Sequence, residues 1–203
     1  MAETLKKSVS AGLMIGIGSV LYISCENKVV GALLFSVGLF AVCAFGMYLF
    51  TGKIGYVFSN KNNPNCLLIW LGNFLGASAG MALVRFAKPA LHEPARQMME
   101  AKLEQNYLGL PVLAFFCGLL MYIAVENYRE NPHGFGKGAI LFLCVSGFIL
   151  CGFEHSIADI CYAALAVETF GDFLRYLLFI IVVSVFNGLG SLAVRWLNTE
   201  KKK

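Results

Sequence analysis

The sequence predicts an all-α integral membrane protein with six transmembrane helices, two of them broken. Of its 203 residues, 58% are hydrophobic and only 14% are charged, and the mean hydropathy is +0.70, whereas a soluble domain carries about 25% charged residues. Six charge-free runs come close to or reach the roughly 20 residues that a span needs. They are Ser8–Cys25, Val29–Gly52, Asn62–Val84, Gln105–Val125, Gly138–Phe153 and Tyr176–Val194. The length fits one domain over residues 1–203.

The second and fifth runs contain polar breaks. The second run ends at Leu49-Phe50-Thr51-Gly52-Lys53 and resumes as Ile54–Ser59. The fifth run reaches Gly152-Phe153-Glu154-His155-Ser156-Ile157-Ala158-Asp159 and continues to Val167. Ionisable groups at membrane depth usually face a protein interior or an aqueous path. We therefore expect these two breaks to form two walls of one pore.

The two halves of the chain follow the same order of segments. Each has a plain span, a broken span and a span with an Asn-x-x-Gly element, which begins at Asn73 in the first half and at Asn187 in the second. Three spans per half predict an inverted repeat, and discontinuous helices at matching positions of such repeats point to the permeation site. Repeat one is expected over residues 8–86 and repeat two over residues 107–196. The longer spacing in the second half predicts a longer connection at Ala163–Asp172.

The polar stretch at residues 87–106 predicts a linker helix on the outer surface, over Ala95–Gln105. Lys and Arg accumulate in the cytoplasmic loops of membrane proteins. An even number of spans places both termini on one side, and that side holds ten of the sixteen basic residues. This bias predicts a multi-pass protein of the cell inner (plasma) membrane with both termini in the cytoplasm. The ten residues are Lys6, Lys7, Lys53, Lys61, Arg129, Lys137, Arg195, Lys201, Lys202 and Lys203.

Three motifs resemble the formate/nitrite transporter family. They are Phe45-Gly46-Met47-Tyr48-Leu49-Phe50-Thr51-Gly52, Leu71-Gly72-Asn73-Phe74-Leu75-Gly76-Ala77 and Gly152-Phe153-Glu154-His155-Ser156-Ile157-Ala158, in the family's order. The similarity covers roughly Ser10 to Trp196. The resemblance implies a homopentamer with an aquaporin-like fold, in which each protomer holds its own pore. It also implies transport of a small monovalent anion or its conjugate acid, such as formate, nitrite or hydrosulfide.

The same resemblance assigns residues to the pore. The central histidine of the family falls on His155, its second-span threonine on Thr51, its outer-vestibule lysine on Lys102 and its sixth-span asparagine on Asn187. The apolar constrictions map to Phe35, Leu39, Leu49, Phe50, Met121 and Phe148.

Two positions depart from the family pattern. The fourth span reads Cys117-Gly118-Leu119 where the family usually has Cys-Asn-Trp, and Asp159 stands where the family has asparagine. The change at Gly118 predicts a wider or less polar wall on the fourth span.

These residue types fit the passage of a weak acid. A bare anion in hydrocarbon faces an idealised penalty of tens of kcal/mol, so the pore needs attraction outside, a proton source at its narrowest point and dry walls. Lys102 can attract the anion, and His155 can carry a proton because histidine titrates in the physiological range. Phenylalanine side chains can exclude water, and the hydroxyl of Thr51 can donate to His155 or to the anion.

Several candidates also have a purely structural interpretation. His155 is either a proton-relay group or a histidine bonded within the core. Glu154 is expected to cap backbone amides at the break or to pair with Lys53 or with another protomer. For Asp159 the sequence allows both a structural and a functional role.

The remaining polar candidates divide in the same way. Asn73 and Asn187 either bond carbonyls freed at the breaks or face the pore, and we expect structure for Asn73 and the pore for Asn187. His92 and His133 are expected at the surface. We expect no metal or cofactor, because no His, Cys or carboxylate set has ligand spacing and the seven Cys residues include no CxxC pair.

Four functions compete at this stage. The first is a passive or proton-coupled channel for a small monovalent anion. The second is a membrane enzyme that uses His155 with Glu154 or Asp159, but no nucleophile elbow, metal set or cofactor motif supports it. The others are an aquaporin-like pore for a small neutral solute and a structural membrane protein without transport. The net charge of +4 lies in loops and tails and is no nucleic-acid signature.

Overall fold

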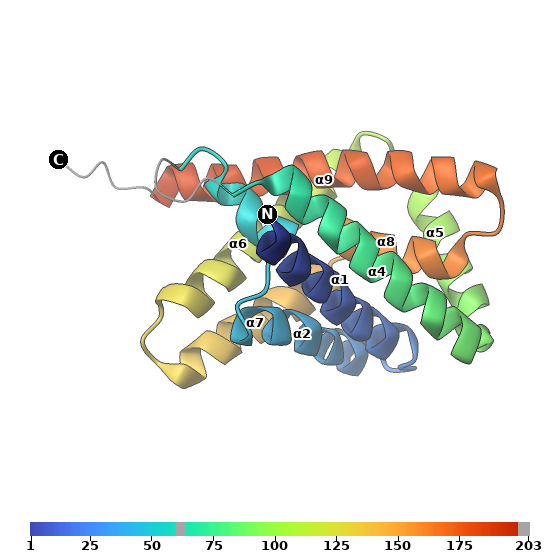
Figure 1. The fold of residues 1–203 in the computed structure, drawn as a ribbon, viewed down its shortest axis with the longest axis horizontal. Helices are drawn as coiled ribbons and strands as arrows, with labels where there is room; N and C mark the ends of the chain where they lie inside the picture. The colour runs from blue at the N-terminus through green and yellow to red at the C-terminus, as the bar shows by residue number, and fades with distance from the viewer. Residues whose placement is uncertain (60–63, 199–203) are drawn as a thin grey trace.

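The computed structural model describes residues 1–59 and 64–198, and within them the chain is helical without a strand (Figure 1). This confirms the all-α class. Lys61 and Lys201 to Lys203, which entered the orientation argument, lie outside the described residues. The elements in chain order are α1 (Ala2–Ile23), α2 (Lys28–Ala44), α3 (Phe50–Lys53), η1 (Ile54–Tyr56), α4 (Cys66–Ala87), η2 (Pro89–Leu91), α5 (His92–Leu103), α6 (Gly109–Glu130), α7 (Gly134–Leu150), α8 (Ser156–Ala166) and α9 (Phe170–Asn198).

Several helices are long and apolar enough to cross a membrane. Among the described residues, three single helices are both long enough and apolar enough: α4, α6 and α9. The apolar helices α2, α7 and α8 are shorter because the breaks divide the second and fifth runs. Large apolar side chains such as Leu33, Leu75 and Leu178 are exposed on α2, α4 and α9. Exposed apolar surface of this extent indicates contact with lipid or with other subunits.

Both predicted breaks are present. Break one is residues 45–49, between α2 and α3, and break two is residues 151–155, between α7 and α8. In each, the second residue is a glycine with positive φ: +60° at Gly46 and +67° at Gly152. The next amide then bonds back to the preceding helix, from Met47 to Val42 and from Phe153 to Phe148, both at 2.9 Å. Glycine takes this left-handed conformation without the Cβ penalty, which is how many helices end.

Two pairs of helices pack at backbone contact. α1 runs along α4 (Figure 1), and α6 packs on α9 in the other half. A Cβ at Gly76 of α4 would lie 2.0 Å from the carbonyl oxygen of Val9, and a Cβ at Gly190 of α9 would lie 2.0 Å from that of Phe115. Only glycine permits these crossings, as is common where helices pack in lipid.

The structure corrects the prediction for the fourth-span wall. A Cβ at Gly118 would lie 2.0 Å from the carbonyl oxygen of Asn187. The backbone of α9 therefore fills the space beside Gly118, so the wall is not wider there. The close contact between α6 and α9 requires a glycine at this position.

Two predicted boundaries also differ from the structure. The linker helix α5 spans His92–Leu103 rather than Ala95–Gln105. The long connection predicted at Ala163–Asp172 is wrong, because only residues 167–169 separate α8 from α9. The greater spacing between His155 and Asn187 is taken up by helix, because α8 continues to Ala166 and α9 begins at Phe170.

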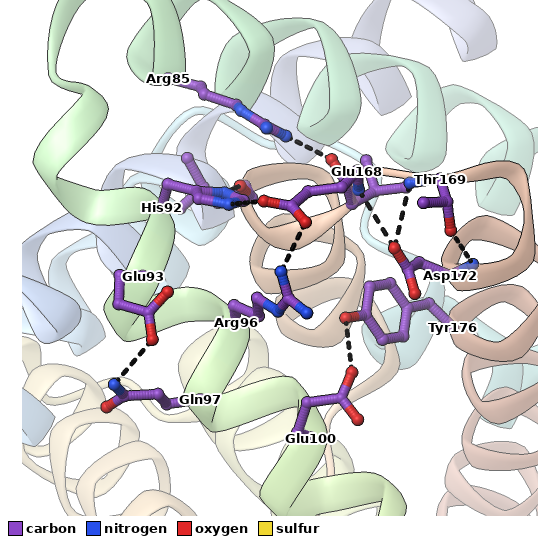
Figure 2. Close-up of polar contacts among 12 residues, drawn as sticks. Arg85, His92, Glu93, Arg96, Gln97, Glu100, Glu168, Thr169, Asp172 and Tyr176 are labelled. Carbon is purple, nitrogen blue, oxygen red and sulfur yellow. Dashed lines mark hydrogen bonds and ion pairs between the residues drawn. The ribbon is translucent and has the colours of Figure 1, made fainter.

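Polar side chains fasten α5 to the connection between α8 and α9 (Figure 2). His92 Nδ1 lies 2.7 Å from the carbonyl oxygen of Leu165, and His92 Nε2 lies 2.7 Å from Glu168 Oε1. Arg96 also donates to Glu168, and the Tyr176 hydroxyl donates to Glu100. The hydrogen bond from His92 lowers the pKa of the Glu168 carboxyl below its ordinary value.

These contacts change the interpretation of one histidine. His92, expected at the surface, is half-buried and anchors α5, whereas His133 is exposed as expected. The anchored helix α5 carries Lys102 near its C-terminal end, so these contacts help to position that lysine.

Candidate functional site

The two breaks meet at a hydrogen bond between Thr51 and His155. Thr51 Oγ1 lies 2.9 Å from His155 Nε2, and both side chains are buried. His155 Nδ1 accepts a hydrogen bond from the amide of Ala158 at 3.1 Å and so caps the N-terminus of α8. Since Nδ1 accepts, the neutral imidazole carries its proton on Nε2 and donates it toward Thr51. The phenyl ring of Phe148 stacks on the imidazole, with 5.5 Å between ring centroids.

Asn73 holds break one through three hydrogen bonds. Its Nδ2 donates to the carbonyl oxygens of Ser8, at 2.7 Å, and Tyr48, at 2.8 Å. Its Oδ1 accepts from the amide of Phe50 at 2.7 Å. The side chain therefore ties α1, break one and the start of α3 together, in the structural role that the sequence favoured for it.

Asn187 holds break two in the same manner. Its Nδ2 donates to the carbonyl oxygens of Ala114, at 2.7 Å, and Glu154, at 2.8 Å, while its Oδ1 accepts from the amide of Ser156 at 3.0 Å. Both donor hydrogens are used by the backbone, whereas the sequence favoured a pore-facing role for this residue. The structure thus gives the two asparagines the same task.

Lys102 forms an ion-pair cluster with two acids beside break two. It pairs with Glu154 and, at 3.2 Å between Nζ and Oδ1, with Asp159. Gln105 Nε2 donates to the other Glu154 oxygen at 2.5 Å. The acid side chains are 1% and 0% exposed, and that of Lys102 is 16% exposed. Pairing of Glu154 with Lys53 was one of the predictions. In the structure Glu154 pairs with Lys102 instead.

Two cavities adjoin the breaks that carry Thr51 and His155. The first, here called the α5-side cavity, has a volume of about 570 Å³ and includes Phe35, Lys102, Gln105, Phe148, Glu154, His155 and Asp159 in its wall. The second, the Lys53-side cavity, has a volume of about 330 Å³ and includes Val42, Cys43, Leu49, Gly52, Lys53, Val125, Arg129 and Lys137. His155 belongs to the first wall, and the neighbours of Thr51 belong to the second.

The predicted constriction residues do not all share one place. Phe35 and Phe148 meet edge to face, with 6.1 Å between ring centroids, in the wall of the α5-side cavity. Leu49 lies in the wall of the Lys53-side cavity, and Leu39 and Met121 are buried in the surrounding apolar cluster.

Phe50 has a different environment from the other five. It lines a separate apolar groove between α4 and α9, together with Trp70 and Ser184. Phe50 is part of the same buried apolar cluster as the other five residues, but it is not among the residues that line the two cavities.

Polar residues of these walls that were not singled out from the sequence include Gln105, Arg129 and Lys137. Gln105 lies just beyond the end of α5, and its spacing of three from Lys102 would place both on one face of the linker helix predicted from the sequence. Arg129 and Lys137 flank the α6–α7 connection, and nothing in their local sequence points to the cavity. Among residues 1–59 and 64–198, no group of three or more His, Cys, Asp or Glu side chains is arranged to hold a metal ion.

Interrupted helices that meet at a buried polar contact characterise membrane channels and transporters. The model of one such family, described as formate/nitrite transporter, matches residues 1–199. The chain therefore belongs to the formate/nitrite transporter family. Together with its apolar helices, this membership indicates a multi-pass protein of the inner membrane.

Curated relatives agree with the family assignment. The formate channel FocA of Escherichia coli K12 is 25% identical over 181 residues, which cover 77% of this chain and 64% of the relative. FocA of Haemophilus influenzae is 23% identical over 175 residues, which cover 74% of this chain and 62% of the relative. The aligned part thus spans less than two thirds of these relatives. They are named as channels and not as enzymes.

Solved structures show the same fold. An ion channel of this family superimposes with a TM-score of 0.84 at 21% identity, covering 98% of this chain and 91% of the other. A pentameric formate channel with formate bound superimposes with a TM-score of 0.77 at 22% identity, covering 97% and 93%.

Proposed function

We propose that the protein is a channel for a small monovalent anion or its conjugate acid, of the formate, nitrite or hydrosulfide class, and that His155 relays a proton to the substrate. The observation that carries this proposal is the buried contact between Thr51 and His155, at breaks that adjoin two cavities. Family membership supports the transport class, and the relatives named as formate channels support the substrate class.

The geometry at His155 suggests how the relay operates. Nδ1 is engaged by the Ala158 amide, so Nε2 is the nitrogen that exchanges a proton. The Thr51 hydroxyl accepts from Nε2 and can donate its own hydrogen to an anion in the constriction. Nδ1 first takes up a proton from water in exchange for the Ala158 hydrogen bond, so the imidazole is cationic when Nε2 passes its own proton through the Thr51 hydroxyl to the anion. The imidazole is then left neutral, the substrate is neutral where the walls are apolar, and the reverse steps return the proton when the substrate leaves. Neutralisation removes most of the cost of placing an anion in an apolar region.

We further propose that the fold is a six-span, aquaporin-like inverted repeat with both termini in the cytoplasm. Matching features of the two halves lie 106 residues apart: the left-handed glycines are Gly46 and Gly152, and the amides bonded by the clamping asparagines belong to Phe50 and Ser156. Under this arrangement the α5-side cavity is the outer vestibule and the Lys53-side cavity the inner one. Lys102 attracts the anion from outside.

A homopentamer completes this proposal. The solved relative that is titled a pentameric formate channel supports it, as do the exposed apolar faces of α2, α4 and α9. Each protomer then carries its own pore, because both cavities and the Thr51–His155 contact belong to one chain.

The proposal is tested by flux of formate, nitrite and hydrosulfide into liposomes that contain the purified protein, between about pH 5 and 8, where histidine changes charge. We compare wild type with His155→Ala and His155→Asn. Asparagine is a good N-cap residue and keeps the start of α8, but it does not titrate. Both variants are expected to lose flux or its pH dependence.

Other outcomes would favour a competing function. Unchanged anion flux in a folded His155→Asn protein would contradict the relay. Passage of a small neutral solute, unaffected by pH or by either variant, would favour the aquaporin-like pore.

A further inference from the structure

Asp159 is a buried acid of the α5-side cavity to which the proposed relay gives no task. It lies in the first turn of α8, four residues after His155, and its side chain is fully buried. Its ion-pair partner among the described residues is Lys102, and neither carboxylate oxygen receives a hydrogen bond of normal geometry there. Acceptors this deeply buried normally have hydrogen-bond partners, so the arrangement needs an explanation.

The charges around Asp159 do not balance. Lys102 is shared with Glu154, which also receives a hydrogen bond from Gln105. With both acids ionised, one partly exposed lysine faces two buried carboxylates, and the cluster carries a net charge of −1. Burial of an uncompensated charge is costly, and two carboxylates that share a site tend to hold a proton between them. Glu154 accepts from both Lys102 and Gln105, whereas Asp159 has, among the described residues, only the Lys102 ammonium at 3.2 Å, so the proton belongs on Asp159.

Other groups near Asp159 do not supply the missing positive charge. His155 is neutral in this geometry because its Nδ1 accepts from an amide. The nearby thiols and phenols are neutral at ordinary pH, and Lys28, also in the cavity wall, is exposed. These neighbours are Tyr22 from α1, Cys117 from α6, and Cys161 and Tyr162 from α8 itself.

An anion that enters this cavity must approach Lys102 and its two acids. If Asp159 is ionised, the anion meets a cluster that is already negative, and like charges at contact distance repel strongly. If Asp159 is protonated, the cluster is neutral and the carboxyl becomes a hydrogen-bond donor. The carboxyl can then donate to the anion beside Lys102.

Building on the channel function, we propose that Asp159 is a specificity-determining residue: the α5-side cavity admits a small monovalent anion only while Asp159 holds a proton. Flux then falls as pH rises, because Asp159 loses the proton that entry needs. Asparagine, the residue that the family pattern has here, is always neutral and always a donor, so it would remove this control.

The test measures formate and nitrite flux into liposomes at about pH 5.5 and 8 for wild type, Asp159→Asn and Asp159→Ser. We expect either substitution to raise flux at the higher pH by about tenfold over wild type and to change it little at the lower pH. The ratio of the two fluxes therefore falls. Asp172→Asn is the matched control, because it removes one acid from the exposed start of α9, outside the cavity, and keeps a side chain that can cap the helix.

The outcomes separate this proposal from the channel function. A purely structural Asp159 would lower flux at both pH values in the variants and leave the ratio of the two fluxes as in wild type. That result, or a wild-type flux independent of pH, would overturn the proposal. If His155→Asn leaves flux unchanged while Asp159→Asn alters the ratio, the relay fails and the role of Asp159 stands.

Discussion

Break one and break two share a backbone but differ in their side chains. Each begins near a left-handed glycine, is held by three hydrogen bonds from one asparagine and leads into a short helix. At positions 106 residues apart, however, the chemistry differs. The pairs are Tyr48 and Glu154, Leu49 and His155, and Lys53 and Asp159. Glycine and asparagine determine where the chain breaks, while the neighbouring residues are free to differ and to carry different tasks.

The two cavities differ accordingly. The wall of the α5-side cavity contains both acids and bases, with Glu154 and Asp159 against Lys102. The wall of the Lys53-side cavity contains the bases Lys53, Arg129 and Lys137, and the acids that pair with Arg129 lie outside it. One cavity can therefore change its charge with pH, whereas the other stays positive. This difference is the reason why we propose that entry is controlled at the α5 side.

The largest effect is expected from removing either clamp. In Asn73→Ala or Asn187→Ala, two carbonyls and one amide lose their partners, and each buried unsatisfied group costs about 1–3 kcal/mol. We expect each variant to lose about 3 kcal/mol or more of stability, seen as a lower melting temperature in detergent. Gln97→Ala, which removes one exposed hydrogen bond, is the control. A loss in one variant alone would show that the two breaks are not equivalent.

A smaller effect is expected at the contact between the breaks. Thr51→Val keeps the shape of the side chain and removes the hydroxyl that faces His155 Nε2. We expect formate flux to fall about tenfold, the factor that corresponds to one hydrogen bond of about 1.4 kcal/mol. The melting temperature should fall less than in the clamp variants, because one buried group and not three loses its partner. Thr51→Ser should restore the flux. If Thr51→Val transports like wild type, the hydroxyl takes no part in the relay.

The smallest effect is expected in the Lys53-side cavity. Lys53→Met removes a positive charge that lies over the Tyr48 ring and keeps most of the side-chain volume. We expect formate flux to fall a few-fold at low ionic strength and to approach wild type at high salt, because salt screens attraction to a partly open site. Lys88→Met, an exposed lysine outside this cavity, should leave flux unchanged. Equal losses in both variants would mean that Lys53 has no special role.

Local sequence patterns were enough to predict the helical class and both breaks. Helices depend on apolar runs, and the ends of α2 and α7 depend on a glycine a few residues away. The same local signals located Thr51 and His155, because polar groups in an apolar run are visible without knowledge of the fold. Their hydrogen bond, across 104 residues, was expected because both breaks were assigned to one pore.

The sequence by itself thus determined which segments are helical, where two of them break and which polar groups lie at the breaks. Only the tertiary structure decided how the partners were distributed. Lys102 and not Lys53 pairs with Glu154, and the Asn187 side chain bonds backbone groups. The backbone of α9 fills the space beside Gly118. These contacts join elements far apart in the chain, and their choice depends on how closely the helices approach and on which groups remain unpaired after packing. Neither property can be predicted from a short stretch of residues.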